Sequence, residues 1–194
     1  MAFLDICFIG NGSHANCIKK IISNIDNNFN FIEHDRTLDI DQQPDVLNSD
    51  IIFITSPNNT HIHYLRKLSK IYQGYVYCEK PPINKFEDIE IFDLINPSKI
   101  FFGFNYRYSE IQEFIINTKE KHDIGELINI NIHMSYPFSI KENYKHSWKS
   151  DINKSPTGVI ENLGIHYIDL SVTLLGAVKQ VFLHSTNRNK TETA

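Results

Sequence analysis

The opening of the chain constrains the fold more than any other feature, because a short apolar run leads into a glycine turn and then into a helical pattern. The run over residues 3–9 is followed by Gly10-Asn11-Gly12-Ser13-His14-Ala15, which has the spacing G-x-G-x-x-A. Apolar residues then recur at helical intervals over residues 17–25. Strand, glycines and helix in this order predict a dinucleotide-binding unit in which the amino end of the helix faces the phosphates.

The small residues of the turn and an acidic residue after the next strand each have a distinct role in such a unit. Gly10 permits the tight turn, Gly12 lets the backbone approach a pyrophosphate, and Ala15 keeps the helix close to the strand. Asp35 follows the next apolar run, at the place where an acidic residue binds the ribose hydroxyls. Its carboxylate favours NAD by repelling a 2′-phosphate, whereas the neighbouring Arg36 leaves NADP open.

Composition excludes several classes of protein. The 194 residues carry a net charge of −4 with no basic stripe, so nucleic acids and anionic membranes are poor candidate partners. No segment is apolar enough to span a membrane, and the amino-terminal run reads as a core strand rather than a signal peptide. Cys7, Cys17 and Cys78 lie in apolar patterns, which favours small core residues over a catalytic thiol and indicates a reducing cytoplasm.

Strand and helix patterns alternate through the first half of the chain. After the opening unit, strands are expected over residues 50–55, 75–78 and 99–104, and helices over residues 61–72 and 86–94. This alternation predicts an α/β fold with a parallel, doubly wound sheet, and we assign residues 1–105 to this Rossmann domain.

The second half has a different pattern, typical of an α+β domain with an open sheet. Helices are expected over residues 108–119 and 159–175, each followed by an alternating strand, over residues 127–136 and 178–185. Two strands do not make a stable sheet unaided. Residues 106–194 are therefore predicted to be an incomplete second domain, truncated at its carboxyl end.

Ligands of a doubly wound sheet bind beyond the carboxyl ends of its strands, where four segments of this chain are expected. They are residues 10–15, Asp35-Arg36, Pro57-Asn58-Asn59-Thr60-His61 and Glu79-Lys80-Pro81. Lys80 follows a buried strand, and a lysine held there can hydrogen-bond a substrate hydroxyl. A solvated lysine after a strand is an equally good interpretation of the spacing alone.

The helix expected over residues 159–175 has an apolar stripe for the core and a separate polar row. The row places Asn162, His166 and Asp169 at i, i+4 and i+7. Histidine is a natural general base near neutral pH, with a polar neighbour to fix its tautomer, but a solvent-exposed polar face is the alternative. No second histidine or cysteine stands at ligand spacing, so no metal site is predicted.

Together these residues resemble the family of glucose–fructose oxidoreductase, inositol dehydrogenase and rhizopine-catabolism oxidoreductases (Gfo/Idh/MocA). The resemblance spans nearly the whole chain and rests on residues 10–15, 57–61, 79–81, Asn105-Tyr106-Arg107 and Gly164-Ile165-His166-Tyr167-Ile168-Asp169-Leu170. It implies a Rossmann domain that binds NAD(P), and an α+β domain whose open sheet shapes the substrate site and an interface for homo-oligomers.

By this resemblance, Lys80 and His166 are the catalytic residues: Lys80 orients the substrate hydroxyl and His166 is the acid–base group. The implied cofactor contacts are residues 10–15, Asp35, Arg36, Pro57, Asn58, His61, Glu79, Lys80 and Pro81. The implied substrate contacts are Lys80, Arg107, Trp148, Lys149, Asn162 and His166. Such enzymes transfer a hydride between nicotinamide C4 and a hydroxyl or ketone carbon of a sugar, cyclitol or related ring.

A narrower resemblance concerns residues 146–151 and 161–166, which are similar to the nucleotide-sugar branch. That branch includes UDP-N-acetylglucosaminuronate 3-dehydrogenases of surface-polysaccharide pathways. Asn162 fits it, because many other relatives carry aspartate there, whereas Pro156-Thr157-Gly158 replaces the usual double or triple glycine. The early carboxyl end leaves a second hypothesis open, a non-catalytic NAD-binding remnant or one half of a split enzyme.

Overall fold

The computed structural model describes residues 3–122, 125–134 and 142–184. The chain divides into two compact units, Met1–Gly103 and Phe104–Ala194. The first unit holds a five-stranded sheet with its helices, and the described part of the second is built from helices and turns.

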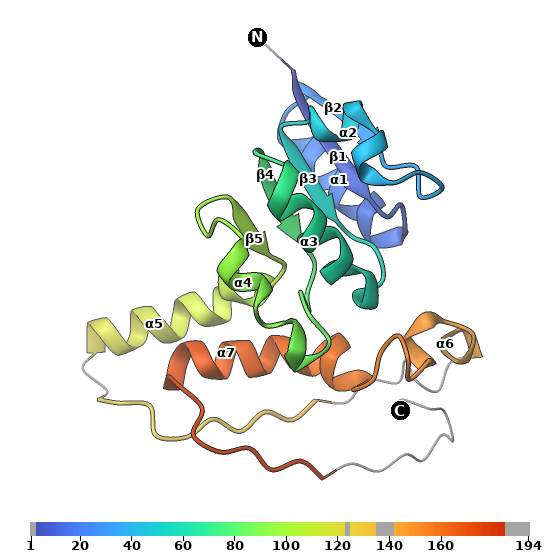
Figure 1. The fold of residues 1–194 in the computed structure, drawn as a ribbon. Coiled ribbons are helices and arrows are strands. Elements are labelled where there is room, and N and C mark those ends of the chain that lie inside the picture. The colour runs from blue at the N-terminus through green and yellow to red at the C-terminus, as the bar shows by residue number, and fades with distance from the viewer. Residues whose placement is uncertain (1–2, 123–124, 135–141, 185–194) are drawn as a thin grey trace. The chain divides into compact units, whose positions relative to one another are not determined.

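All strands of the first unit belong to one parallel sheet. They are β1 (Leu4–Ile9), β2 (Phe29–Glu33), β3 (Ile51–Ile54), β4 (Tyr75–Cys78) and β5 (Ile100–Phe102), in the order β2-β1-β3-β4-β5 (Figure 1). The chain adds β2 on one side of β1 and β3 on the other, so the switch point of the topology lies between β1 and β3. The predicted parallel, doubly wound sheet is confirmed.

Helices cover both faces of this sheet. Helix α1 (Ser13–Ile25) lies on one face, and α2 (Pro44–Leu47), α3 (His61–Ile71) and α4 (Ile91–Leu94) lie on the other (Figure 1). The helix expected over residues 86–94 is shorter than predicted, since Phe86–Asp88 forms a 3-10 turn. Only Ile91 is buried in that segment, so it lacks the apolar face that stabilises a longer helix.

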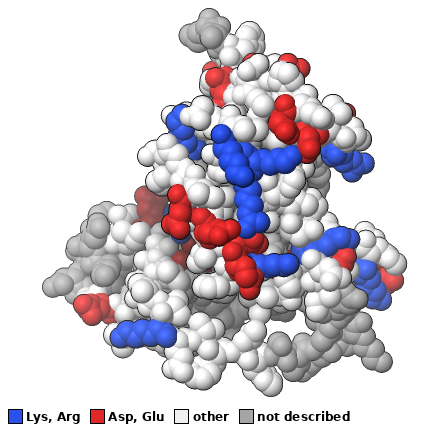
Figure 2. All heavy atoms as spheres, viewed as in Figure 1, with Lys and Arg blue, Asp and Glu red and all other residues white. Residues whose placement is uncertain are grey.

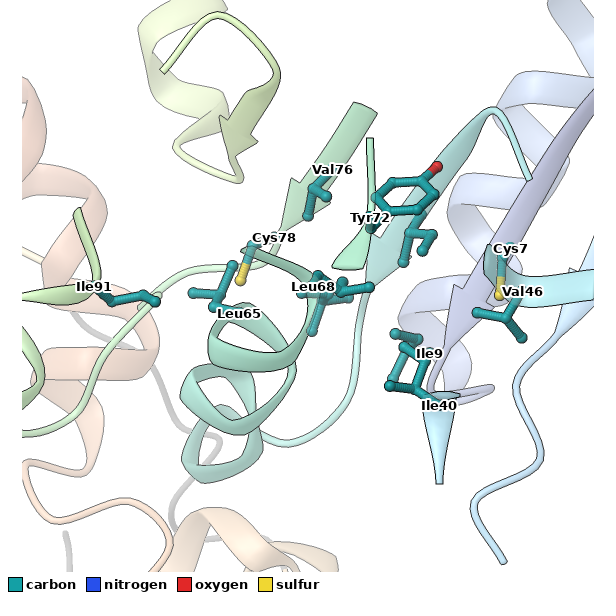
Figure 3. Close-up of a cluster of buried hydrophobic side chains, with 12 residues drawn as sticks. Cys7, Ile9, Ile40, Val46, Leu65, Leu68, Tyr72, Val76, Cys78 and Ile91 are labelled. Carbon is teal, nitrogen blue, oxygen red and sulfur yellow. The ribbon is translucent and has the colours of Figure 1, made fainter. Parts of the chain in front are cut away.

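The core has two layers because alternate side chains of β1 point to opposite faces. Ile6 and Phe8 pack with Ala15 on the α1 side. Cys7 and Ile9 belong to the larger cluster on the other side, which is drawn in Figure 3. Burial on both faces explains why these strands are continuous apolar runs rather than alternating ones.

The prediction that Cys17 is a core residue is wrong. Cys7 and Cys78 are buried, but Cys17 is exposed on α1. The face of α1 that packs on the sheet carries Ile18 and Ile22, and Cys17 falls beside this narrow stripe.

The regular elements in the described part of the second unit are helices and short turns. They are a 3-10 turn over Asn105–Tyr108, α5 (Glu110–His122), α6 (Glu142–Lys145), a 3-10 turn over Trp148–Ser150, a π-helix over Ile160–Gly164 and α7 (Ile165–Leu175) (Figure 1). The helix predicted over residues 159–175 is therefore not regular. Its first turn is a π-helix, whose i→i+5 pattern changes the spacing of the side chains.

Two predicted strands are not formed in the described residues. Residues 127–134 and 178–184 carry alternating patterns, yet neither segment is a strand in the structure. The ends of both predictions, residues 135–136 and residue 185, lie outside the described residues. Alternation is a local property of the sequence, whereas a strand also requires hydrogen bonds from a neighbouring strand.

Charged side chains of both signs lie next to one another on the face drawn in Figure 2. In the first unit, Arg66 pairs with Asp88 at 2.9 Å, and Lys67 pairs with Asp39 at 2.5 Å. Among the described helices, none combines the length and apolar character needed to cross a membrane.

Candidate functional site

The glycine turn after β1 packs directly against the end of β3. Gly10 has a φ of +102°, and a Cβ there would lie 2.6 Å from the backbone nitrogen of Ser56. The hydroxyl of Thr55 donates to the Gly10 carbonyl at 2.7 Å. Only glycine fits this close approach of two backbones, which occurs at the switch point between β1 and β3.

The amino end of α1 provides a place for phosphate groups. Gly12 is the N-cap, and no described atom lies within 4 Å of the position that a Cβ would take there. The first helical hydrogen bond runs from the Asn16 N–H to the Gly12 carbonyl, so the N–H groups of the first turn point out of the amino end of the helix. Helix α1 is described throughout and has no acidic side chain in its first turn. These features fit the pyrophosphate of a dinucleotide.

Asp35 is exposed just beyond β2, with Arg36 exposed beside it. Its Oδ1 accepts hydrogen bonds from the Thr37 hydroxyl at 2.7 Å and from the Thr37 N–H at 2.8 Å. These bonds hold the pKa of the Asp35 carboxyl below its usual value. An ionised, oriented carboxylate at this position can accept hydrogen bonds from the ribose hydroxyls of a nucleotide.

Glu79, which follows β4, is bonded to the helix that begins at the glycine turn. Its Oε1 lies 2.8 Å from Nε2 of His14 and accepts a hydrogen bond from the Tyr77 hydroxyl at 2.7 Å. Burial opposes ionisation of Glu79, but these hydrogen bonds outweigh it, and the pKa of the carboxyl is lowered. Gly103 makes room for the cluster, because a Cβ there would lie 2.7 Å from the Tyr77 hydroxyl. Neither Tyr77 nor Gly103 belongs to a motif, and sequence reasoning missed both.

His61 is fully buried at the start of α3. Its Nε2 lies 2.8 Å from the Ser56 carbonyl, and its Nδ1 lies 2.8 Å from the Pro81 carbonyl. Burial lowers the pKa of the ring and outweighs the two carbonyl groups, which raise it. The side chain thus joins the turn after β3 to the turn after β4.

Lys80 and Pro81 complete the carboxyl end of β4. The peptide bond between them is cis, Lys80 is half-buried and Pro81 is buried. In the turn after β3, Asn58 is buried and Pro57 is exposed. The residues expected to contact the cofactor therefore lie at neighbouring strand ends along one edge of the sheet.

Arg107 and Asp169 form a two-pronged ion pair within the second unit. Nε of Arg107 donates to Oδ2 at 2.8 Å, and Nη2 donates to Oδ1 at 2.5 Å. The bond to Asp169 raises the pKa of the guanidinium. The pair joins the 3-10 turn Asn105–Tyr108 to α7, so the planar fork expected to contact substrate is occupied by Asp169.

His166 is only 9% exposed and lies against an aromatic neighbour. Its ring stacks on Tyr106, with centroids 4.7 Å apart and an angle of 18° between the planes. Tyr106 also meets Tyr167 edge-on at 5.2 Å, and a hydrogen bond that its hydroxyl donates to Tyr167 raises the pKa of Tyr106. Tyr106 therefore helps to fix the His166 ring. Sequence reasoning missed this role, although the Asn105-Tyr106-Arg107 motif contained the signal.

Asn162, His166 and Asp169, which were expected to form one polar row, have separate partners in the structure. Nδ2 of Asn162 donates to the Ser155 hydroxyl at 2.9 Å and to the Gly158 carbonyl at 2.8 Å, which closes the turn before the helix. His166 and Asp169 face other partners, Tyr106 and Arg107. The predicted row assumed 3.6 residues per turn, and the π-helix Ile160–Gly164, which contains Asn162, breaks that spacing.

Trp148 and Lys149 occupy the 3-10 turn Trp148–Ser150. Nζ of Lys149 lies 5.7 Å from the centroid of the Trp148 ring, and the Tyr144 hydroxyl donates to the Lys149 carbonyl at 3.1 Å. Burial lowers the pKa of the Lys149 amine. This amine is less hydrated than a surface lysine, which favours contact with an anionic or hydroxyl group.

A parallel sheet with a glycine turn at its switch point defines the Rossmann class of dinucleotide-binding folds. The WlbA dehydrogenase from Bordetella pertussis, solved with NADH and UDP-GlcNAcA, matches with a TM-score of 0.79 at 17% identity, over 98% of this chain and 65% of that one. The scyllo-inositol dehydrogenase from Lactobacillus casei, solved with NAD(H) and scyllo-inositol, matches with a TM-score of 0.68 at 16% identity, over 90% and 56%. At these identities the likeness shows a shared fold.

Sequence comparison finds a similar family and a similar curated protein. A family model described as the GFO/IDH/MocA C-terminal domain matches residues 117–194. Glucose-6-phosphate 3-dehydrogenase of Bacillus subtilis (strain 168) is 30% identical over 127 residues, which are 63% of this chain and 35% of that protein. Residues 117–194 are thus similar to the C-terminal domain of the GFO/IDH/MocA family. The chain spans about a third of the length of this curated relative.

Proposed function

We propose that this chain is an NAD-dependent oxidoreductase that transfers a hydride between nicotinamide and a ring hydroxyl or ketone of a sugar or nucleotide sugar. The observation that carries the proposal is the glycine turn at the β1–β3 switch point, with open space at Gly12 and an ionised carboxylate at Asp35. The glycine turn and the amino end of α1 would hold the pyrophosphate, and Asp35 would hold the ribose.

The chain's own residues supply hydrogen bonding and proton transfer in this proposal. Bound NAD would accept the hydride from the carbon that carries the substrate hydroxyl. The Lys80 ammonium donates a hydrogen bond to that hydroxyl oxygen and offsets the charge that develops on it. His166 takes the hydroxyl proton, so the alcohol becomes a ketone. The roles of Lys80 and His166 rest on the family resemblance and on their positions in the motifs.

A nucleotide sugar is the substrate class that we favour. The resemblance of residues 146–151 and 161–166 to the nucleotide-sugar branch supports it, as does the WlbA dehydrogenase solved with UDP-GlcNAcA. We therefore propose oxidation at C3 of a UDP-N-acetyl-hexuronate, in cytoplasmic biosynthesis of a surface polysaccharide. Lys149, half-buried beside Trp148, is the side chain that we expect to contact this substrate.

Calorimetry and a substrate panel test the proposal in two steps. NAD is titrated into the purified chain, and heat of binding is expected with a 1:1 stoichiometry. The chain with NAD is then mixed separately with UDP-N-acetylglucosaminuronate, glucose 6-phosphate and scyllo-inositol, and the absorbance of reduced nicotinamide is followed. We expect the largest increase with the nucleotide sugar. Binding of NAD without turnover of any substrate would instead support a binding-only role, and no binding would contradict the proposal.

A further inference from the structure

A buried glutamine that belongs to no motif holds the loop after β2. Gln43 lies between the 3-10 turn Ile40–Gln42 and α2, and only 9% of its surface is exposed. Its side-chain amide lies within hydrogen-bond distance of four backbone groups of this loop. A buried amide with several backbone partners fixes the path of a loop from the inside.

The amide of Gln43 binds both polar groups of the Asp35 main chain. Oε1 accepts a hydrogen bond from the Asp35 N–H at 2.9 Å, and Nε2 donates to the Asp35 carbonyl at 3.0 Å. A neighbouring strand would make the same pair of bonds. The last such bond from β1 comes one residue earlier, where the His34 N–H donates to the Phe8 carbonyl. Gln43 therefore extends the ordered backbone of β2 as far as Asp35.

Nε2 of Gln43 also contacts the backbone at the far end of this loop. Nε2 of Gln43 lies 3.1 Å from the Leu38 carbonyl and 3.3 Å from the Asp39 carbonyl. A primary amide has two N–H groups, so the three carbonyl oxygens share them. The Gln43 side chain thus holds the backbone from Asp35 to Asp39 by hydrogen bonds at both ends of this segment.

We propose that Gln43 is a positioning residue that orients the Asp35 carboxylate and thereby sets the preference for NAD over NADP. This inference rests on the proposed function, since it requires that a dinucleotide binds beside Asp35. Gln43 holds the Asp35 main chain, and Thr37 holds Oδ1 of its side chain, so the direction of Oδ2 is set. A fixed carboxylate binds a ribose diol and repels a 2′-phosphate better than a mobile one does.

Gln43→Met tests the role of the amide, because methionine fills the same buried space without hydrogen-bonding groups. Gln42→Met is the matched control, since Gln42 is the neighbouring glutamine and is exposed. Dissociation constants for NAD and NADP are measured by calorimetry. In Gln43→Met we expect NAD binding to weaken about tenfold and NADP binding to change by less than about threefold. Gln42→Met should leave both constants unchanged.

Coupling to Asp35 distinguishes positioning from a general loss of structure. In an Asp35→Asn background, Gln43→Met should no longer change the ratio of the two constants. Amide exchange at Asp35, measured without cofactor, should be faster in Gln43→Met than in the wild type. Equal weakening of NAD and NADP, or an effect that persists in Asp35→Asn, would overturn the inference.

Titrations of the wild-type chain distinguish a failure of the proposed function from a failure of the inference about Gln43. A wild-type chain that binds neither cofactor would overturn the proposed function and this inference together. A wild-type chain that binds NAD, with an unchanged NAD-to-NADP ratio in Gln43→Met, would overturn this inference alone.

Discussion

An added side chain would meet different surroundings at Gly10 and at Gly12. Substitutions at these two positions should therefore affect folding and cofactor binding separately. At Gly10, φ is +102° and a Cβ would lie 2.6 Å from the Ser56 nitrogen. We expect Gly10→Ala to lower the free energy of unfolding by about 3 kcal/mol. At Gly12 a Cβ meets no described atom, and serine is a good N-cap residue. Gly12→Ser should therefore change stability by less than about 0.5 kcal/mol.

Cofactor titration completes this comparison. In Gly12→Ser the new side chain would stand in the path of the pyrophosphate, so we expect NAD binding to weaken at least about tenfold. Urea denaturation measures the stability of both variants, and calorimetry measures NAD binding by Gly12→Ser. Unchanged NAD affinity in Gly12→Ser would contradict the placement of the phosphates at this turn.

The Glu79 carboxyl makes the stability of the first unit depend on pH. Its pKa in the folded chain lies below the ordinary value of 4.5, so the ionised group stabilises the fold above that value. This contribution is lost as the pH falls below 4.5 and through the lowered pKa. Glu79→Gln should be about 1 kcal/mol less stable than the wild type at about pH 7, and the difference should shrink as the pH falls through the lowered pKa of Glu79.

Denaturant titration of both chains at several pH values measures this difference. Glu33→Gln is the control, because the Glu33 side chain is 61% exposed, and it should change stability by less than about 0.5 kcal/mol at each pH. A constant difference between Glu79→Gln and the wild type across the range would show that the ionised carboxylate is not what stabilises the cluster.

Helices and strands could be predicted where the apolar pattern of the sequence reflects their burial, and less well elsewhere. The strand Tyr75–Cys78 was located to the residue, because its apolar run begins after Gly74 and stops at Glu79-Lys80-Pro81. The π-helix Ile160–Gly164 leaves no such signature, since its residues also suit an α-helix. Residues 127–134 and 178–184 have strand patterns, but pairing depends on a partner that no local pattern specifies.

The ion pair that joins the Asn105–Tyr108 turn to α7 should depend on the planar fork of arginine. Lysine offers a point charge and cannot make both bonds to Asp169 in the same geometry. Because Arg107 is half exposed, we expect Arg107→Lys to cost only about 1 kcal/mol of stability. Asp169→Asn should cost a similar amount, and the double variant less than the sum of the two.

Arg66→Lys is the matched control for this double-mutant cycle. Arg66 is also about half exposed, but it donates through one nitrogen to two separate carboxylates, Asp88 and Glu90. Arg66→Lys should lower the free energy of unfolding by less than about 0.5 kcal/mol. Additive losses for Arg107→Lys and Asp169→Asn in denaturant titrations would show that the pair does not act as a unit.

For the whole molecule, motifs located the residues near the expected site but not the contacts that hold them. Gln43 was missed because its partners are backbone groups, and Tyr106 because its ring partner, His166, is distant in the sequence. Tyr77 was missed because its hydrogen bond to the nearby Glu79 leaves no sequence pattern. His61 was expected at the cofactor, yet its ring is buried between two backbone carbonyls. Single-sequence motifs report which residue types recur, whereas hydrogen-bond partners are decided by tertiary structure.

The proposed reaction uses two side chains of the chain, Lys80 and His166. We expect Lys80→Met and His166→Asn each to reduce kcat at least about a hundredfold, because each removes a group that acts on the substrate hydroxyl. Neither group is needed to hold the pyrophosphate or ribose, so the Kd for NAD should stay within about threefold of the wild-type value.

Exposed residues of the same types provide the controls for these two substitutions. Lys70→Met and His63→Asn alter exposed side chains of α3 and should retain wild-type turnover. Steady-state kinetics with the best substrate of the panel, together with NAD titrations, measures all four variants. Full turnover in Lys80→Met or His166→Asn would remove that residue from the mechanism. Equal loss of turnover and of NAD affinity would show instead that the residue supports the cofactor site.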